Sequence, residues 1–365
     1  MKLLFTPGKI GNMEIKNRFV RSATGESLAA ADGQVTDALV SRYTELAKGG
    51  VGLIVTGVAF VHESGRSGYK MPGLHKDEMI PGWQRLIKQA HNYGAKIVPQ
   101  IFHCGRQMQA DSAQDFPPIA PSPIAYKRTG ITPREMTDEQ IWELIEAFGE
   151  AARRAREAGF DGVQLHGAHG YLISQFLSPY SNRRTDQWGG SFENRQRLVT
   201  EVYKRIRQVA GQDYPLFIKM NIDDYVEGGL TLEETRKTAR LLSDLGMDAI
   251  EISGGTLELS IWKCLVPGIK SREQEAYFLP YAPEIKSEIR CPLILVGGMR
   301  TPALMEEILQ QKKADFISLC RPFIREPDLV NKIEQGQEDP VTCISCNKCL
   351  RFLDRGLACY VDAEA

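Results

Sequence analysis

Two histidines and a tyrosine follow directly on an apolar run near the middle of the chain. The run from Gly162 to Leu165 is typical of a buried strand, and His166, His169 and Tyr171 come immediately after it. A single histidine is more often a hydrogen-bonded core residue than a functional one. Two histidines with a tyrosine at one strand end can donate hydrogen bonds and protons to a bound molecule. We take them as candidate catalytic and substrate-binding residues.

The residues that follow strengthen this interpretation. A long polar loop without periodicity runs to a helix that begins near Glu193, and loops of this length are usually functional or disordered. The stretch resembles the Old Yellow Enzyme family of flavin-dependent ene-reductases, which carries His-x-x-His-Gly-Tyr-Leu, then Phe-Leu-Ser-Pro, then Asn-x-Arg-x-Asp-x-Trp/Tyr-Gly-Gly-Ser. All three pieces are present here in the same order, at residues 166–172, 176–179 and 182–191.

Composition excludes several classes of partner. The formal net charge is −1 and 25% of the 365 residues are charged, which gives no sign of a nucleic-acid or membrane-surface partner. The N-terminus lacks the features of a signal peptide and no apolar run is long enough to span a bilayer, so we expect a cytoplasmic protein. Its partner is then expected to be a small molecule.

Apolar runs and helix-forming segments alternate along most of the chain. Two short apolar segments between residues 3 and 16 predict a hairpin that caps a larger unit. From Phe19 onward there are about eight strand and helix pairs, the number that closes a barrel. The predicted strands cover residues 19–22, 52–58, 96–101, 162–165, 216–220, 249–252, 292–296 and 316–319. We therefore predict a (β/α)8 TIM barrel over residues 1–335, with residues 336–365 as a cysteine-containing extension and not an independent domain.

Barrel geometry makes a prediction that is independent of the resemblance. Functional groups of such barrels lie at the C-terminal ends of the strands. Polar side chains collect at these ends, and polar groups are costly to bury unless they meet a polar ligand. They are Ser22, Thr24, Gln100, His103, His166, His169, Lys219, Asn221 and residues 253–255.

The last two predicted strands end in groups that suit a phosphate. Gly297 and Gly298 follow the seventh strand, and Cys320 and Arg321 follow the eighth. Barrels often bind phosphate at this place, where backbone N–H groups, a helix N-terminus and a cation converge on an anion. A Gly-Gly pair alone indicates no more than a turn, but together with Arg321 it predicts a phosphate site.

The resemblance covers residues 5 to about 327 and implies that FMN binds at this face. The positions that resemble the family's cofactor-binding residues are Ser22, Ala23 and Thr24 along the flavin ring, Gly57 or Val58 beneath it, Gln100 and Lys219 at its pyrimidine edge, and Gly297, Gly298, Cys320 and Arg321 around the phosphate. Lys219 would offset the negative charge that reduction places on the flavin. Where many family members have threonine or cysteine near the flavin C4 carbonyl, this chain has Gly25, so that side chain's influence on the redox potential is expected to be absent.

The resemblance also implies a cycle of two half-reactions. NAD(P)H would reduce FMN and leave, and an activated alkene would then bind over the same flavin face. His166 and His169 would donate hydrogen bonds to the substrate oxygen, and Tyr171 would deliver a proton to the α-carbon. The open alternative for Tyr171 is a loop anchor whose hydroxyl caps the backbone. No Gly-x-Gly-x-x-Gly motif occurs, so nicotinamide is expected to bind at the flavin itself.

Four of the eight cysteines, Cys343, Cys346, Cys349 and Cys359, lie close together near the C-terminus. Their spacing suits a [4Fe–4S] cluster or a structural zinc. It resembles that of iron–sulfur members of the family such as dienoyl-CoA reductases and trimethylamine dehydrogenase, although the last gap is shorter than in those relatives. A set of partly buried free thiols is the open alternative.

Two other functions stay open. The chain could be an iron–sulfur flavoprotein dehydrogenase or an electron-transfer reductase, for which an occupied cluster would be diagnostic. It could also be a non-catalytic subunit of a larger complex, against which the intact histidines, tyrosine and phosphate-site residues argue. Barrels of this group often associate, so we also allow for a homo-oligomer.

Overall fold

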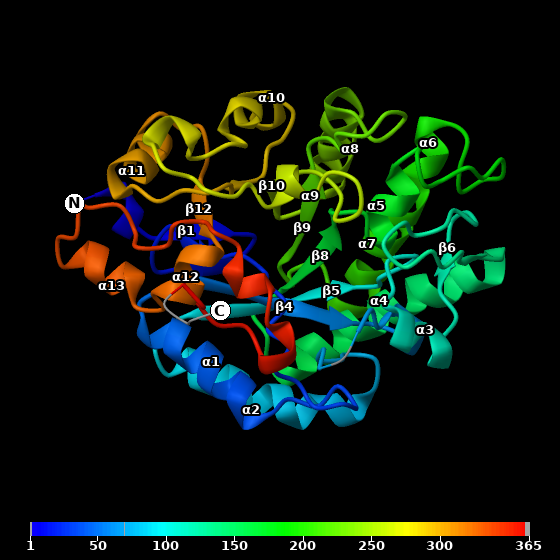
Figure 1. The fold of residues 1–365 in the computed structure, drawn as a ribbon, viewed down its shortest axis with the longest axis horizontal. Helices are drawn as coiled ribbons and strands as arrows, with labels where there is room; N and C mark the ends of the chain where they lie inside the picture. Colours follow the sequence, from blue (N-terminus) through cyan, green and yellow to red (C-terminus); the bar gives the residue numbers. More distant parts are fainter. Residues whose placement is uncertain (1, 69, 362–365) are drawn as a thin grey trace.

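The computed structural model describes residues 2–68 and 70–361. Within them, eight parallel strands close into a barrel (Figure 1). Each barrel strand pairs with the barrel strands that precede and follow it along the chain, and the last strand pairs with the first. The strands are β3 (Phe19–Arg21), β4 (Leu53–Phe60), β5 (Lys96–Phe102), β8 (Val163–Gly167), β9 (Leu216–Asn221), β10 (Ala249–Ser253), β11 (Leu293–Leu295) and β12 (Phe316–Leu319). The predicted (β/α)8 TIM barrel is confirmed.

Helices cover the outside of the barrel, and local capping signals set their ends. α4 (Asp138–Ala158) starts at Thr137, whose hydroxyl accepts from the Gln140 N–H, and ends at Gly159, whose φ of 93° is left-handed. The other outer helices are α1 (Asp37–Lys48), α2 (Ile80–His91), α7 (Arg197–Ala210), α8 (Leu232–Leu245), α10 (Ala282–Lys286), α11 (Pro302–Gln310), α12 (Arg321–Arg325) and α13 (Leu329–Glu334).

Apolar side chains fill the interior of the barrel toward its N-terminal end. Most strands are buried along their whole length, which explains why they form apolar runs in the sequence. β1 (Gly8–Ile10) and β2 (Met13–Ile15) form the antiparallel hairpin that the sequence predicts. Its apolar side chains pack with interior side chains of the strands, among them Val20 and Phe316. The hairpin thus closes one end of the barrel, and the polar groups lie at the other.

Short elements occupy the loops between strands and outer helices. They are β6 (Ile119–Ala120), β7 (Arg134–Glu135), α3 (Ala110–Asp115), α5 (Leu172–Leu177), α6 (Phe192–Arg195) and α9 (Ile261–Cys264). The helix expected over residues 193–210 is divided into α6 and α7 at Gln196, whose amide donates to the Thr238 hydroxyl of α8. No helix in the described part of the chain is both long and apolar enough to cross a membrane.

The C-terminal segment, residues 341–361, packs along the barrel (red in Figure 1). It begins where the Val341 N–H donates to the Arg300 carbonyl. Farther on, Cys349 and Leu357 form a small apolar cluster with Ile324 of α12. These contacts agree with an extension that depends on the barrel, while the boundary at residue 335 stays a prediction.

Candidate active site

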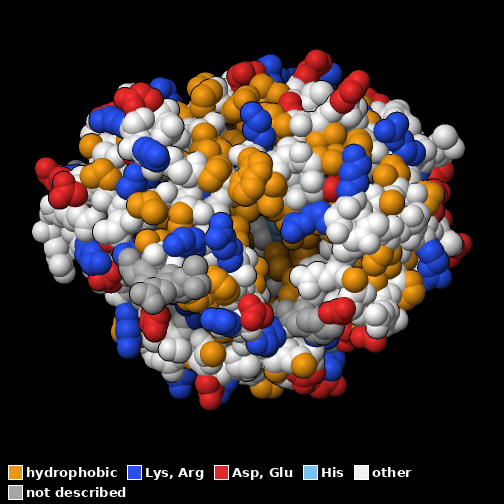
Figure 2. Space-filling model, in the orientation of Figure 1, with side chains coloured by type: hydrophobic (Ala, Val, Ile, Leu, Met, Phe, Trp, Pro, Cys, Tyr) orange, Lys and Arg blue, Asp and Glu red, His pale blue; other side chains and the backbone are white. Residues whose placement is uncertain are grey.

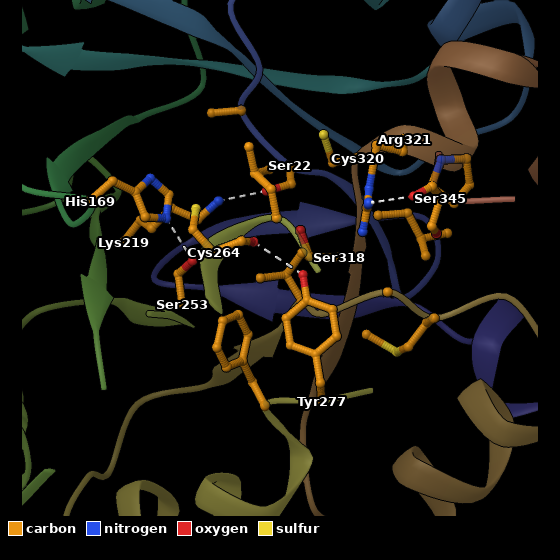
Figure 3. A pocket seen from close by; sticks show the side chains of 18 residues that line it. Ser22, His169, Lys219, Ser253, Cys264, Tyr277, Ser318, Cys320, Arg321 and Ser345 are labelled. Atoms are coloured by element: carbon orange, nitrogen blue, oxygen red, sulfur yellow. Dashed lines mark hydrogen bonds between the residues drawn. The ribbon is translucent and has the colours of Figure 1, made fainter. Parts of the chain in front are cut away.

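A cavity of about 300 Å³ lies where the C-terminal ends of the strands converge. Figure 2 shows a hollow near the middle of the face in view, with basic and apolar side chains at its rim. The predicted site residues that line the cavity are Ala23, Thr24, Gln100, His166, His169, Tyr171, Lys219, Cys320 and Arg321. A narrower cavity of about 80 Å³ shares several of these residues and adds Ser22 and Gly298 (Figure 3).

His166, His169 and Tyr171 form one cluster of rings. The ring centroids of His166 and His169 are 5.2 Å apart, and those of His166 and Tyr171 are 4.8 Å apart. Phe102 of β5 packs edge-on against Tyr171, with centroids 5.1 Å apart. The Ala168 N–H donates to His166 Nδ1, so the proton of the neutral ring lies on Nε2, which is left as a donor.

Burial keeps this cluster uncharged. It lowers the pKa of His166 well below the usual value, and neighbouring His169 and Lys219 lower it further. Burial together with Lys219 lowers the pKa of His169 to about 3. Burial also raises the pKa of the Tyr171 hydroxyl. At neutral pH the cavity therefore presents two neutral imidazoles and a protonated phenol.

The loop after β8 is held in a conformation that few side chains adopt. His169 has a φ of 61° and Gly170 a φ of 78°. Asn221 accepts from the His169 N–H at 3.0 Å, and Gln107 donates to the His169 carbonyl at 2.8 Å. His169 Nε2 lies 2.7 Å from the Ser253 hydroxyl at the end of β10 (Figure 3). His169 therefore keeps only Nδ1 for a ligand, whereas His166 keeps Nε2.

The segment after β3 forms one wall of the cavity. Thr24 lines this wall, and a Cβ at Gly57 would stand 2.5 Å from the Thr24 carbonyl oxygen. Gly57 thus supports the wall from behind, and the neighbouring Val58 lines the cavity instead. A Cβ at Gly25 would meet nothing within 4 Å, so the cavity is open at this position.

Gln100 and Lys219 belong to a buried network that the sequence prediction missed. Lys219 Nζ donates to Ser22 Oγ at 2.6 Å and lies 3.1 Å from Glu251 Oε1. Gln100 Nε2 donates to Gln164 Oε1 at 2.6 Å, and Gln164 Nε2 donates to Glu251 Oε2 at 2.8 Å. Glu251 and Gln164 are both 0% exposed. The lone acid within the apolar run of β10 was the available sequence signal for Glu251.

Three of the residues predicted to bind a phosphate, Gly298, Cys320 and Arg321, line the narrower cavity. Gly298 lines it with a φ of 71°, and Gly297 behind it has a φ of 135°, values that favour glycine. Arg321 lines it as well, but its Nη1 already donates to the Val266 carbonyl at 2.8 Å and to Asn347 Oδ1 at 2.7 Å. The C-terminal segment therefore holds the cation in the cavity wall, a contact that the sequence did not predict.

Irregular loops supply further lining residues that carry no periodicity signal. Cys264 of α9 lines both cavities, and burial raises the pKa of its thiol to about 12. Tyr277 lines the narrower cavity, and its hydroxyl donates to the Cys264 carbonyl at 3.2 Å (Figure 3). Leu257 lines the wider cavity, and its N–H donates to the His169 carbonyl at 3.3 Å.

The four C-terminal cysteines lie on the barrel close to this site. Cys349 lines the wider cavity, Cys343 is buried, and the Cys359 thiol accepts from Arg325 at 3.6 Å. Among residues 2–68 and 70–361, no three His, Cys, Asp or Glu side chains are arranged to hold a metal ion. Cys343, Cys346, Cys349 and Cys359 are therefore not brought together as a set of metal ligands in the described residues, and the metal site stays a prediction.

The sequence is similar to proteins of one family. The sequence profile of the NADH:flavin oxidoreductase / NADH oxidase family matches residues 3–340. The NADH oxidase of Thermoanaerobacter brockii is 40% identical over 346 residues, which is 94% of this chain and 52% of that protein. The NADPH dehydrogenase of Geobacillus sp. (strain WCH70) is 38% identical, with 89% of this chain and 92% of that protein covered.

A solved structure agrees with these relatives. The 2-naphthoyl-CoA reductase complex superposes with a TM-score of 0.90 at 32% identity, over 95% of this chain and 54% of that one. This chain therefore spans about half the length of that reductase and of the NADH oxidase. The resemblance to Old Yellow Enzymes is confirmed, and the chain belongs to the NADH:flavin oxidoreductase / NADH oxidase family.

Proposed function

We propose that this chain is an NAD(P)H-dependent FMN oxidoreductase that reduces the C=C bond of an activated alkene, an α,β-unsaturated carbonyl or nitro compound. One observation carries the proposal: a single cavity is lined both by the neutral His166, His169 and Tyr171 and by Gln100 and Lys219. Groups suited to a substrate oxygen and groups suited to a flavin thus share one space. The name of the 2-naphthoyl-CoA reductase gives that protein a substrate with a carbonyl attached to an aromatic ring, which supports a carbonyl-containing substrate here.

The residues present fit FMN. Gln100 and Lys219 would meet the polar edge of the ring system, and Gly298 and Arg321 would meet the phosphate. The bare backbone at Gly25, where a Cβ would meet nothing within 4 Å, leaves room for a close approach. Bound FMN would accept hydride from NAD(P)H and pass it to the alkene.

The chain's own side chains would activate the alkene. His166 Nε2 and His169 Nδ1 would donate hydrogen bonds to the substrate oxygen, which gains negative charge during hydride transfer. Because their lowered pKa values keep both rings neutral, they would bind this oxygen without giving up a full proton to it. The Tyr171 hydroxyl, protonated at neutral pH, would supply the proton to the α-carbon.

An absorption spectrum of the anaerobically purified protein tests this proposal. We expect flavin absorbance that bleaches on addition of NADH or NADPH and returns on addition of an enone such as 2-cyclohexenone. Flavin that bleaches but does not recover with an enone or a nitroalkene would remove the substrate assignment. A colourless protein that binds no added FMN would remove the enzyme assignment and favour a non-catalytic subunit.

A second candidate is an iron–sulfur flavoprotein that passes electrons to another acceptor. It is favoured by the position of Cys349 in the cavity wall and by the greater length of the related NADH oxidase. Broad absorbance around the flavin bands, together with matching amounts of iron and acid-labile sulfide, would support it. Protein with flavin but without iron after anaerobic purification would support the ene-reductase alone, and a zinc analysis of the same sample would distinguish a structural zinc from free thiols at the four cysteines.

A further inference from the structure

One buried carboxylate connects the polar side chains of six strands or strand ends at the centre of the barrel. Glu251 Oε1 accepts from Ser22 Oγ at 2.8 Å and from Ser318 Oγ at 2.9 Å, and it lies 3.1 Å from Lys219 Nζ. Glu251 Oε2 accepts from Gln164, whose own oxygen accepts from Gln100. Glu251 itself does not line the cavity described above, but Gln100 and Lys219 do.

We propose that Glu251 is a positioning residue that fixes both the hydrogen-bonding pattern of Gln100 and the place and field of the Lys219 ammonium. The inference rests on the proposed function, because it assigns Gln100 and Lys219 to the polar edge of a flavin. The Glu251 carboxylate at the centre of the barrel would then orient Gln100 and Lys219, the two residues that would contact the cofactor.

Strand register brings these groups together. Glu251 of β10 is paired directly with Lys219 of β9, and Gln164 of β8 is paired directly with Gln100 of β5. Directly paired residues of parallel strands point to the same side of the sheet, here into the barrel. The two pairs are joined by the Gln164–Glu251 hydrogen bond, so the network is built by the fold and does not depend on flexible loops.

Glu251 acts as an acceptor in this arrangement. A lysine, two hydroxyls and an amide direct their hydrogens at its two oxygens, three of them at Oε1 and the amide at Oε2, so each of these contacts uses Glu251 as the acceptor. The Gln164 amide must therefore turn its NH2 group toward Glu251 and its oxygen toward Gln100. Gln100 must in turn use one N–H on Gln164 and is left with its oxygen and its second N–H.

This donor–acceptor order suits the edge of an imide. The pyrimidine edge of a flavin alternates carbonyl oxygens with one N–H, so a ligand there needs an acceptor and a donor side by side. Gln100 offers that pair only while the chain of amides keeps its direction. Reversal of Gln164 would bring two NH2 groups or two oxygens face to face, which a buried site does not tolerate.

Glu251 also sets the charge felt at the site. The Lys219 ammonium is held between Ser22 Oγ and the Glu251 carboxylate, and Lys219 is 4% exposed. A negative charge 3.1 Å from the ammonium cancels part of its field in the poorly solvated interior. With the carboxylate present, the flavin would therefore be harder to reduce than beside an unpaired lysine.

Two variants separate these effects in the FMN-loaded protein. Glu251→Gln removes the charge at nearly constant shape, and Gln164→Met breaks the amide chain while leaving the Lys219 ion pair in place. Asp248→Asn is the matched control: this carboxylate likewise pairs with a cation, Arg207, and accepts from the Leu216 N–H, but it lies between β9 and β10 at the opposite end of the barrel. The readouts are the FMN dissociation constant, the dissociation constant of sulfite for the oxidised flavin, and the two-electron potential.

We expect the Glu251→Gln protein to bind sulfite about tenfold more tightly. The two-electron potential of its flavin should rise by about 30 mV, because this shift corresponds to a tenfold change in the equilibrium constant of a two-electron couple. Gln164→Met should weaken FMN binding by about tenfold, the order expected for hydrogen bonds lost at a buried site, with sulfite affinity within about twofold of wild type. Asp248→Asn should lower stability without moving either flavin readout.

Opposite results overturn the inference. If Glu251→Gln keeps the wild-type potential and sulfite affinity, or if Gln164→Met keeps the wild-type FMN affinity, Glu251 is a structural ion-pair partner and does not position these groups. If Glu251→Gln does not fold, the Gln164→Met result decides. Failure of the wild-type protein to bind FMN would be distinct from all of these, since it removes the proposed function.

Discussion

Single residues in the cavity owe their chemical state mainly to burial. The same desolvation that lowers the pKa values of His166 and His169 raises that of Tyr171, so both kinds of group remain neutral. Lys219 lowers the histidine pKa values further and is itself paired with Glu251. The cavity thus combines hydrogen-bond donors that do not titrate near neutral pH with a lysine whose charge is partly offset by Glu251.

Replacement of Tyr171 by phenylalanine tests proton delivery. Without the hydroxyl, reoxidation of the reduced enzyme by 2-cyclohexenone should slow by about 10²–10⁴-fold, the usual contribution of a positioned general acid. Stopped-flow absorbance measures this step separately from reduction by NAD(P)H, which serves as the internal control. Equal rates of enone reoxidation in Tyr171→Phe and wild type would leave Tyr171 as a loop anchor.

His103 makes the stability of the fold depend on pH. Burial lowers its pKa to about 3, whereas an unfolded histidine titrates near 6.5. Between these values the unfolded chain binds a proton that the folded chain does not, so the free energy of unfolding falls as pH decreases from 6.5 toward 3. The limiting slope is about 1.4 kcal/mol per pH unit for one such group.

Urea denaturation of the FMN-free protein between pH 7.5 and 4.5 measures this dependence. Carboxylates and the other buried histidines also contribute, so the comparison with His103→Asn isolates the effect. We expect the variant to lose less stability than wild type between pH 6.5 and 4.5. Parallel curves over this window would show that His103 is already protonated in the folded state or does not differ from the unfolded chain.

At the scale of elements, the predicted site residues that line the cavity lie at or just after the C-terminal ends of the strands. Close backbone contacts between neighbouring segments hold the walls of the cavity in position. The wall after β3 packs closely against β4, where the backbone of Gly57 lies close to the Thr24 carbonyl. The Gly57 N–H donates to the Tyr43 hydroxyl at 2.7 Å. The loop after β8 is fixed in the same way by Asn221 of β9 and by Ser253 of β10. Each functional segment is therefore positioned by the strand beside it.

Two glycine variants test this support. Gly57→Ala places a Cβ 2.5 Å from the Thr24 carbonyl oxygen and should lower the free energy of unfolding by about 1–3 kcal/mol, the usual cost of overpacking. Gly25→Ala lies in the same wall but meets nothing within 4 Å, so its stability should stay within about 0.5 kcal/mol of wild type. Urea midpoints measure both, and equal midpoints for the two variants would contradict the close contact.

Much of the barrel could be predicted from the sequence, because parallel strands buried on both faces appear as apolar runs. The strand-end residues could be predicted too, since barrel geometry assigns them to one face. Glu251 could not, because its role depends on which side chains oppose one another across β9 and β10, and register is not visible in a single sequence. Of the two residues predicted to lie beneath the flavin ring, Val58 lines the cavity and Gly57 lies behind the wall, and a single sequence could not distinguish them.

At the scale of the whole molecule, the C-terminal segment is part of the site. Asn347 bridges the barrel and the segment, since its oxygen accepts from Arg321 and its NH2 group donates to the Leu265 carbonyl at 2.9 Å. Cys349 and Leu350 line the wider cavity beside it. A segment distant in sequence from His166 and His169 thus shapes the same cavity.

Substitution of Asn347 tests this coupling. Asn347 has a φ of 60°, which glycine also adopts, so Asn347→Gly removes the side chain without backbone strain. Loss of the hydrogen bond to Arg321 should weaken FMN binding by about 2–10-fold and riboflavin binding much less, because riboflavin lacks the phosphate. Fluorescence titration of the FMN-free protein measures both ligands.

The control is Ile344→Ala in the same segment, whose side chain is 49% exposed and should affect neither ligand. Equal weakening of FMN and riboflavin in Asn347→Gly would mean that the segment acts on the ring system and not on the phosphate. Unchanged FMN affinity would separate the segment from cofactor binding altogether.

The buried thiol of Cys264 has a consequence for the durability of such an enzyme. Enones and nitroalkenes alkylate cysteines, and the thiolate is the form that reacts. Cys264 lines the cavity in which these electrophiles would bind, but its pKa of about 12 leaves almost none of it as thiolate at neutral pH. The desolvated cavity that would favour reduction of the alkene would therefore also protect this thiol from alkylation by the substrate.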